Sequence, residues 1–110
     1  MKIKIKEWNE KLYDSVWDFK EGLAGVGKDG KWGFINREGK LVIPCEYDSV
    51  YDFKEGLAKA KKDGKRGFIN REGKLVIPFE YDDVSSFNEG LAGAKKDGKL
   101  YIITIEKENE

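Results

Sequence analysis

The chain has 110 residues, in which 21 lysines and arginines balance 21 aspartates and glutamates, with one cysteine and no histidine. This length suits one domain with a modest core, so we treat residues 1–110 as a single domain. The absence of histidine argues against a zinc site and against the commonest acid–base catalyst, the single cysteine excludes an internal disulfide, and the zero net charge gives no overall attraction to nucleic acid. We therefore expect no enzymatic activity, no cofactor and no metal.

The N-terminal residues alternate apolar and charged side chains, which predicts a half-buried strand over Lys2–Lys6 with Ile3 and Ile5 on one face. A signal peptide needs an uninterrupted apolar stretch of about 7–15 residues, and a membrane helix needs about 20. The sequence shows neither, so we expect a cytoplasmic protein that does not enter a membrane.

The sequence repeats at an interval of 34 residues. Residues 23–56 and 57–90 align without a gap, and 25 of the 34 positions are identical. Residues 91–105 begin a third copy, and residues 13–22 match residues 47–56. Such self-similarity is typical of repeat proteins, in which each unit buries its apolar surface against its neighbours.

Each unit contains the signals of a three-stranded antiparallel meander. Asp29-Gly30 lies between two strand-like runs and suits a two-residue hairpin turn with positive φ at both positions. The loop 36–39 ends in a glycine that fits a bulged hairpin. Pro44 cannot donate to a ladder, so we expect the third strand to end there. In the first complete copy the predicted strands are 23–28, 31–36 and 40–43.

The remaining third of the unit connects one meander to the next. Tyr47, Val50 and Phe53 are three positions apart, which would place them on one face of one or two helical turns, with Asp48 as a cap. An irregular connector is the alternative for so short a stretch.

The middle strand of each meander carries apolar residues on both faces. Trp32 and Phe34 share one side and Ile35 lies on the other, as expected for a strand that is buried on both faces. Gly33 leaves room for a bulky neighbour to pack on the backbone. Tyr101 occupies the corresponding position of the last copy, so the third unit must pack differently there.

The strands do not complete three meanders, because the last copy has no third strand after residue 105. We predict that the N-terminal strand fills this place by pairing with Leu100–Ile105, which would give a closed, circularly permuted set. The predicted units are then approximately 13–46, 47–80 and 81–105, the last completed by 1–12. Closure would protect an apolar edge, so deletion of Met1–Lys6 should cause aggregation. The alternative is an open solenoid-like stack.

Four segments of the repeat resemble the bacterial WG (KWG) repeat family: Lys31–Ile35, Gly39–Pro44, Tyr47-Asp48 and Phe53–Ala58. The resemblance covers nearly the whole chain, although the Trp-Gly pair itself occurs once, and Arg66-Gly67 and Leu100-Tyr101 depart from it. It implies a β-rich tandem array that serves as an interaction module. It brings no catalytic residues with it.

The positions that differ between copies give the candidate binding residues. Position by position, the copies align Trp17 with Tyr51 and Ser85, Trp32 with Arg66 and Leu100, and Asp18 with Asp52 and Ser86. Exposed tryptophan, tyrosine and arginine side chains often anchor protein interfaces. The candidates are therefore Trp8, Trp17, Trp32, Tyr51 and Arg66. The alternative is that these side chains fill gaps between units.

The most basic hairpin of the chain gives a second candidate site. Lys59, Lys61, Lys62 and Lys65 would suit an anionic partner. The alternative is that Lys59 and Lys61 alternate with two alanines because they lie on the solvent face of an antiparallel strand.

The remaining motifs favour structural roles. Carboxylates recur at the same place in each unit, which favours caps, turns or ion pairs over a catalytic pair. Cys45 has no histidine to activate it, and the glycine-rich segment before the first hairpin lacks the strand–helix context of a nucleotide-binding loop.

We therefore expect a non-catalytic repeat module for protein–protein interaction or scaffolding. Its partner should be another protein rather than nucleic acid or a membrane, and we favour a monomer. The alternatives are a carbohydrate- or cell-wall-associated module that uses exposed aromatic residues, and a designed or consensus-like repeat protein without a ligand.

Overall fold

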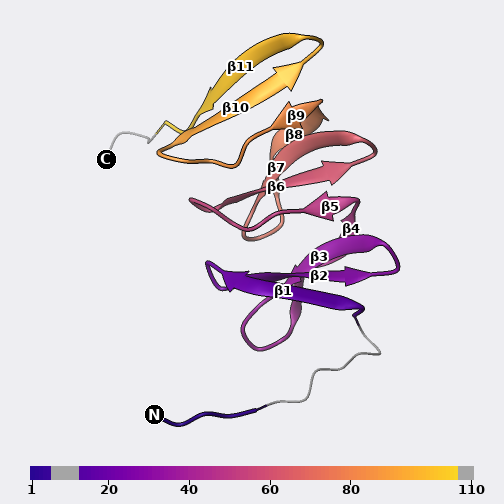
Figure 1. The fold of residues 1–110 in the computed structure, drawn as a ribbon, viewed down its shortest axis with the longest axis vertical. Helices are drawn as coiled ribbons and strands as arrows, with labels where there is room; N and C mark the ends of the chain where they lie inside the picture. Colours follow the sequence, from indigo (N-terminus) through magenta and orange to yellow (C-terminus); the bar gives the residue numbers. More distant parts are fainter. Residues whose placement is uncertain (6–12, 107–110) are drawn as a thin grey trace.

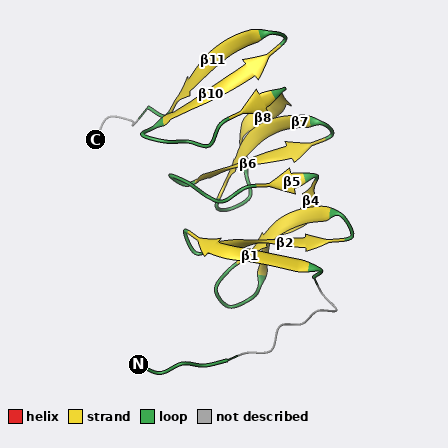
Figure 2. Ribbon diagram, viewed as in Figure 1, coloured by secondary structure: helices red, strands yellow, loops and turns green. Residues whose placement is uncertain are grey.

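The computed structural model describes residues 1–5 and 13–106. These residues form three antiparallel sheets that follow one another along the chain and are stacked (Figures 1 and 2). The molecule measures 47 × 37 × 19 Å, and residues 1–5 lie at the opposite end from the last strand (Figure 1). The predicted all-β architecture is confirmed.

Within each sheet the hydrogen-bonded neighbours are consecutive strands, so the strands of a sheet are joined by hairpins. Sheet 1 consists of β1 (Ser15–Lys20), β2 (Leu23–Lys28), β3 (Lys31–Ile35) and β4 (Leu41–Tyr47). Sheet 2 consists of β5 (Ser49–Val50), β6 (Leu57–Lys62), β7 (Lys65–Asn70) and β8 (Leu75–Tyr81). Sheet 3 consists of β9 (Asp83–Val84), β10 (Leu91–Lys96) and β11 (Lys99–Thr104).

The predicted Asp-Gly turns are confirmed. Asp29 has φ 51° and Gly30 has φ 79°, and the same conformation recurs in the turns that begin at Asp63 and Asp97. Glu21 and Gly22 adopt it as well, with φ 50° and 80°, and return the chain from β1 to β2. A positive φ is uncommon for a residue other than glycine. A two-residue turn of this type needs it at both central positions, and each turn here combines one aspartate or glutamate with a glycine.

The predicted helical turns in the connector are wrong. Residues 49–50 form the short strand β5, and Val50 pairs with Ala60 of β6. The backbone groups that a helix would need are therefore used in a ladder, and an isolated helix this short is unfavourable. Tyr47, Val50 and Phe53 are nevertheless all buried, so the grouping of these three side chains was right and the conformation was wrong.

The prediction that Pro44 ends the third strand is also wrong. β4 continues to Tyr47, and its register against β3 shifts between the pairs Trp32–Tyr47 and Phe34–Ile43. The missing N–H of Pro44 lies in this irregular stretch, where the ladder does not require it.

Gly33 is needed for a different reason from the one expected. A Cβ at this position would lie 2.2 Å from the carbonyl oxygen of Ile43 and 2.7 Å from Pro44. The group that presses on the glycine is thus the main chain of β4, not a bulky side chain. Gly67 meets the main chain of β8 in the same way, with a Cβ position 2.3 Å from the Ile77 oxygen.

The predicted closure is not found, and the structure corresponds to the open stack. Among the described residues β11 pairs only with β10, and residues 1–5 form no strand. Ile3 and Ile5 are 76% and 95% exposed. Lys6, the last residue of the predicted N-terminal strand, lies outside the described residues. Tyr101 supplies a physical reason, because it aligns with Gly33 and Gly67. The main chains of β4 and β8 pass so close to these glycines that no Cβ fits, so a third strand could not pass β11 in the same way.

The core lies mainly between the sheets. Phe34 of sheet 1 meets Phe53, which follows β5, with ring centroids 4.7 Å apart. Phe68 of sheet 2 meets Phe87, which follows β9, at the same distance of 4.7 Å. Ile35 belongs to a separate cluster with Ala24 and Val26, so the prediction that the middle strand is buried on both faces is confirmed for β3. It is wrong for β11, which is almost entirely exposed because no further sheet of the described residues covers it.

Candidate functional site

The most exposed of the candidate aromatic residues lie where sheet 1 meets sheet 2. Trp17 in β1 is 41% exposed, and Tyr51, just after β5, is 42% exposed. Trp8 lies outside the described residues. Trp17 also contacts Trp32, with ring centroids 4.4 Å apart and an interplanar angle of 37°.

A hollow of about 440 Å³ lies beside the rings of Trp17 and Tyr51. It is lined by Val16, Trp17, Asp18, Tyr51 and Asp52. The register of β1 against β2 shifts between Val16 and Phe19, so Trp17 and Asp18 occupy a bulge. A bulge re-aims side chains, which explains how two successive residues of a strand can line the same hollow.

The two carboxylates in the hollow differ from the carboxylates that join successive units, such as Asp48 and Asp82. Neither Asp18 nor Asp52 forms an ion pair or hydrogen bond with another described residue. Neither aspartate is among the site residues predicted from the sequence. The available signal was their alignment beside Trp17 and Tyr51 at a position that becomes Ser86 in the third unit.

The rings of Trp17 and Trp32 pack against glycines of strand β2. A Cβ on Gly25 would lie 3.2 Å from the Trp17 ring, and one on Gly27 would lie 3.1 Å from the Trp32 ring. These two glycines therefore form the floor on which the two tryptophans of sheet 1 lie. The interpretation that the rings fill the space between units fits Trp32, which is half-buried, better than it fits the more exposed Trp17.

In sheet 2 the same positions carry charged side chains. Lys59 replaces the first glycine, and its Nζ lies 4.2 Å from the centroid of the Tyr51 ring and 3.4 Å from the carbonyl oxygen of Val84. Arg66, at the position of Trp32, is half-buried and donates a hydrogen bond to the Asp82 carbonyl oxygen. Arg66 thus links sheet 2 to the connector of sheet 3.

The lysines proposed to bind an anion are not gathered into a free basic patch. Besides Lys59, Lys62 Nζ lies 3.8 Å from the Glu46 carboxylate, and Lys65 is paired with Asp82. Lys61 lies on the same strand and is half-buried. Their alternation with buried alanines agrees with the structural interpretation of this hairpin.

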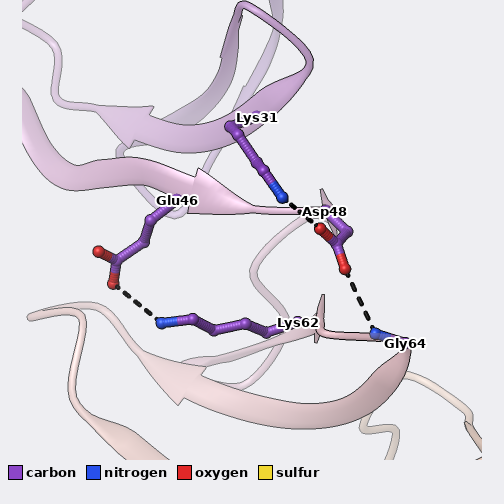
Figure 3. Close-up of polar contacts among 5 residues, drawn as sticks. All are labelled: Lys31, Glu46, Asp48, Lys62 and Gly64. Atoms are coloured by element: carbon purple, nitrogen blue, oxygen red, sulfur yellow. Dashed lines mark hydrogen bonds and ion pairs between the residues drawn. The ribbon is translucent and has the colours of Figure 1, made fainter.

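The repeated carboxylates form contacts between successive units (Figure 3). Asp48 accepts a hydrogen bond from Lys31 Nζ at 2.6 Å and one from the backbone N–H of Gly64 at 3.4 Å. The hydrogen bond from Lys31 lowers the pKa of Asp48, and the same bond raises the pKa of Lys31. Asp82 and Lys65 repeat this pair one unit later, with pKa shifts in the same directions and of the same cause.

A second set of carboxylates caps the turns of the following unit. Glu21 accepts a hydrogen bond from the backbone N–H of Gly56 at 2.9 Å, and Glu55 accepts one from Gly90 at 2.8 Å. The interpretation of the recurrent carboxylates as turn and ion-pair elements is therefore confirmed for these positions.

Cys45 is half-buried, and its Sγ lies 3.7 Å from the carbonyl oxygen of Val26. Burial raises the pKa of the Cys45 thiol, which disfavours the reactive thiolate. No group of three or more histidine, cysteine, aspartate or glutamate residues among those described is placed to hold a metal ion.

Stacked antiparallel sheets that are joined by the same contacts at each junction define a tandem β-repeat protein. The model of a family described as "WG containing repeat" matches residues 10–32, 32–65 and 67–99, so the chain belongs to the WG repeat family. The resemblance noted in the sequence is thereby confirmed. No curated protein and no solved structure matches the chain. The part of the chain that the structure describes contains no helix long and apolar enough to cross a membrane.

Proposed function

We propose that this chain is a non-catalytic module for protein–protein interaction or scaffolding, and that it contacts its partner at the hollow between sheets 1 and 2. The observation that supports this most is the pairing of two exposed rings, Trp17 and Tyr51, with two carboxylates that have no partner among the described residues. Large aromatic side chains often dominate the binding energy of protein interfaces. Here Trp17 lies in the edge strand β1, and Tyr51 directly follows the edge strand β5.

The chemistry of the other polar residues supports a non-catalytic role. Asp48, Asp82, Glu21 and Glu55 all form contacts that join one unit to the next. The Cys45 thiol lies close to the Val26 carbonyl oxygen, and burial raises the pKa of this thiol. The four carboxylates therefore hold successive units together, whereas Asp18 and Asp52 in the hollow make no such contact with a described residue.

A pull-down with matched variants tests the proposal. Trp17→Ser and Tyr51→Ser convert both positions to the residue that the third unit carries at Ser85. We expect the double variant to unfold as cooperatively as the wild type. It should capture at least about tenfold less partner from an extract of the source cells, because interface aromatic residues typically contribute about 2 kcal/mol or more.

Leu41→Ser is the control, because Leu41 is also exposed, at 46%, but does not line the hollow. Equal capture by the wild type and the double variant would contradict the proposal. A double variant that binds an insoluble cell-wall polysaccharide less well, while protein capture is unchanged, would instead favour the carbohydrate-binding alternative. The cytoplasmic location remains a prediction from the sequence.

A further inference from the structure

We propose that the hollow between sheets 1 and 2 recognises a cationic side chain of the partner, and specifically the guanidinium group of an arginine. This inference rests on the proposed function, because it names the chemistry that the same surface recognises. It is based on three properties of the hollow: its charge, its aromatic rings and its size.

The hollow is lined by two carboxylates that form no ion pair with a described residue, although Lys59 Nζ lies over the face of Tyr51, one of its rings. Its lining contains Asp18 and Asp52 and no basic residue. The contrast with the aligned junction carboxylates is direct, since Asp48 is paired with Lys31 and Asp82 with Lys65. Two carboxylates that line one hollow without an ion-pair partner among the described residues favour an incoming cation.

Of the two rings of the hollow, Tyr51 already has Lys59 over its face, so Trp17 is the ring that suits an incoming cation. A cation over the face of tryptophan or tyrosine is attracted by the ring quadrupole, and tryptophan gives the strongest attraction. This chain already uses that chemistry: Lys59 lies 4.2 Å from the centroid of the Tyr51 ring, and Lys62 and Lys96 lie 5.7 and 6.0 Å from the rings of Tyr47 and Tyr81. Trp17 has no such cation from the described part of the chain, and it is 41% exposed.

Arginine satisfies both features better than lysine does. The guanidinium group is planar, so it stacks on an aromatic face while its edge donates two parallel hydrogen bonds to a carboxylate. An ammonium group is a compact, strongly hydrated point charge without that planar edge. A hollow of about 440 Å³ with an open mouth accepts one long side chain of a partner protein at its surface.

The third unit is a natural negative control within the same chain. Ser85 and Ser86 stand where Trp17-Asp18 and Tyr51-Asp52 stand in the first two units, so both the ring and the charge are absent. Ser85 instead uses its hydroxyl oxygen to accept a hydrogen bond from the Gly93 backbone N–H at 2.9 Å. The third unit therefore lacks this recognition chemistry at the positions that form the hollow in the first two units.

The test is a titration of the full chain with three short capped peptides that differ at one residue, arginine, lysine or citrulline. Citrulline has nearly the shape of arginine but no charge. Binding is followed through the indole N–H signal of Trp17 in a two-dimensional NMR spectrum. We expect the arginine peptide to shift this signal with a dissociation constant several-fold lower than that of the lysine peptide, and at least about fivefold lower than that of the citrulline peptide.

Asp18→Asn together with Asp52→Asn should weaken binding of the arginine peptide by about fivefold, since each exposed ion pair contributes a fraction of a kcal/mol. The matched control is Glu38→Gln together with Glu72→Gln, which removes the same charge from the exposed β3–β4 and β7–β8 loops and should leave binding unchanged. Raising the salt concentration should weaken binding to the wild type and have less effect on the Asp18/Asp52 variant.

Equal binding of the arginine and citrulline peptides, or an unchanged affinity in the Asp18/Asp52 variant, overturns the inference. The pull-down separates this failure from failure of the proposed function. If Trp17→Ser with Tyr51→Ser abolishes partner capture while the asparagine variant captures normally, the interaction module stands and arginine recognition falls. If none of these variants changes partner capture, the proposed function falls as well.

Discussion

Sheet 2 and sheet 3 contain hairpins of closely similar sequence, yet their surroundings differ. Phe68 in β7 is completely buried, whereas Ile102, at the matching position of β11, is 77% exposed. Sheet 2 has a neighbouring sheet on each face, while sheet 3 faces only sheet 2 among the described residues. The comparison shows that burial in this stack depends on the neighbouring unit more than on the sequence of the strand itself.

The largest expected effect comes from truncating the buried member of this pair. Phe68→Ala should lower the free energy of unfolding by about 3–5 kcal/mol, because it leaves a cavity between sheets 2 and 3. Ile102→Ala should change it by less than about 0.5 kcal/mol, because the side chain is already in solvent. Urea denaturation of the two variants measures the difference. Similar losses in both would mean that sheet 3 is covered in solution.

The glycines give a second, smaller contrast. Gly67→Ala should destabilise the protein by about 1–3 kcal/mol, because its Cβ would lie 2.3 Å from the Ile77 oxygen and the main chain of β8 must move. Gly93→Ala should be neutral or slightly stabilising, since the nearest atom to its Cβ is the Ser85 Oγ at 3.8 Å. Thermal unfolding of the two variants checks this, and a destabilised Gly93→Ala would contradict the open face.

The ion pairs between units should make stability depend on pH. Because the pKa of Asp48 and of Asp82 is lowered in the folded state, their contribution is present above the ordinary aspartate pKa and is lost as the pH falls through the folded-state value. We therefore expect the urea midpoint to fall as the pH decreases from about 4 towards 2. Asp48→Asn with Asp82→Asn should flatten this fall, and an unchanged slope would show that the pairs contribute nothing.

The smallest effect is expected at the N-terminus. Removal of residues 1–5 should leave the melting temperature and the monomer fraction unchanged, because Ile3 and Ile5 are exposed and pair with no strand. The closed arrangement predicted from the sequence requires the opposite, namely aggregation or loss of cooperative unfolding. Calorimetry and gel filtration of the shortened chain separate the two, since any large fall in melting temperature would favour closure.

The sequence predicts the local structure well where a strong backbone signal is present. The strand at residues 23–28 agrees with β2 to the residue, and the Asp-Gly turns have the expected positive φ at both positions. The pattern also groups Tyr47, Val50 and Phe53 correctly as buried. These features follow from neighbours in the sequence, and the repeat shows each of them more than once.

The sequence does not predict the features that depend on a distant main chain. Pro44 continues in a strand because a bulge removes the need for its N–H, and Gly33 is required by the backbone of β4. The failure of closure depends on the same main-chain contact, since Tyr101 stands where the other units have the glycine that β4 and β8 require. The hollow joins Asp18 to Asp52, which are 34 positions apart, and only the stacking of sheets brings them together.

The distance between the two ends of the stack tests the open arrangement most directly. Pulsed electron paramagnetic resonance measures this distance between spin labels attached to Ile3→Cys and Ile102→Cys in a Cys45→Ser background. Because residues 1–5 and β11 lie at opposite ends of a molecule 47 Å long, we expect a separation that approaches this length. A separation near the spacing of paired strands, about 5 Å between backbones before the labels are added, would contradict the open stack and restore the closed one.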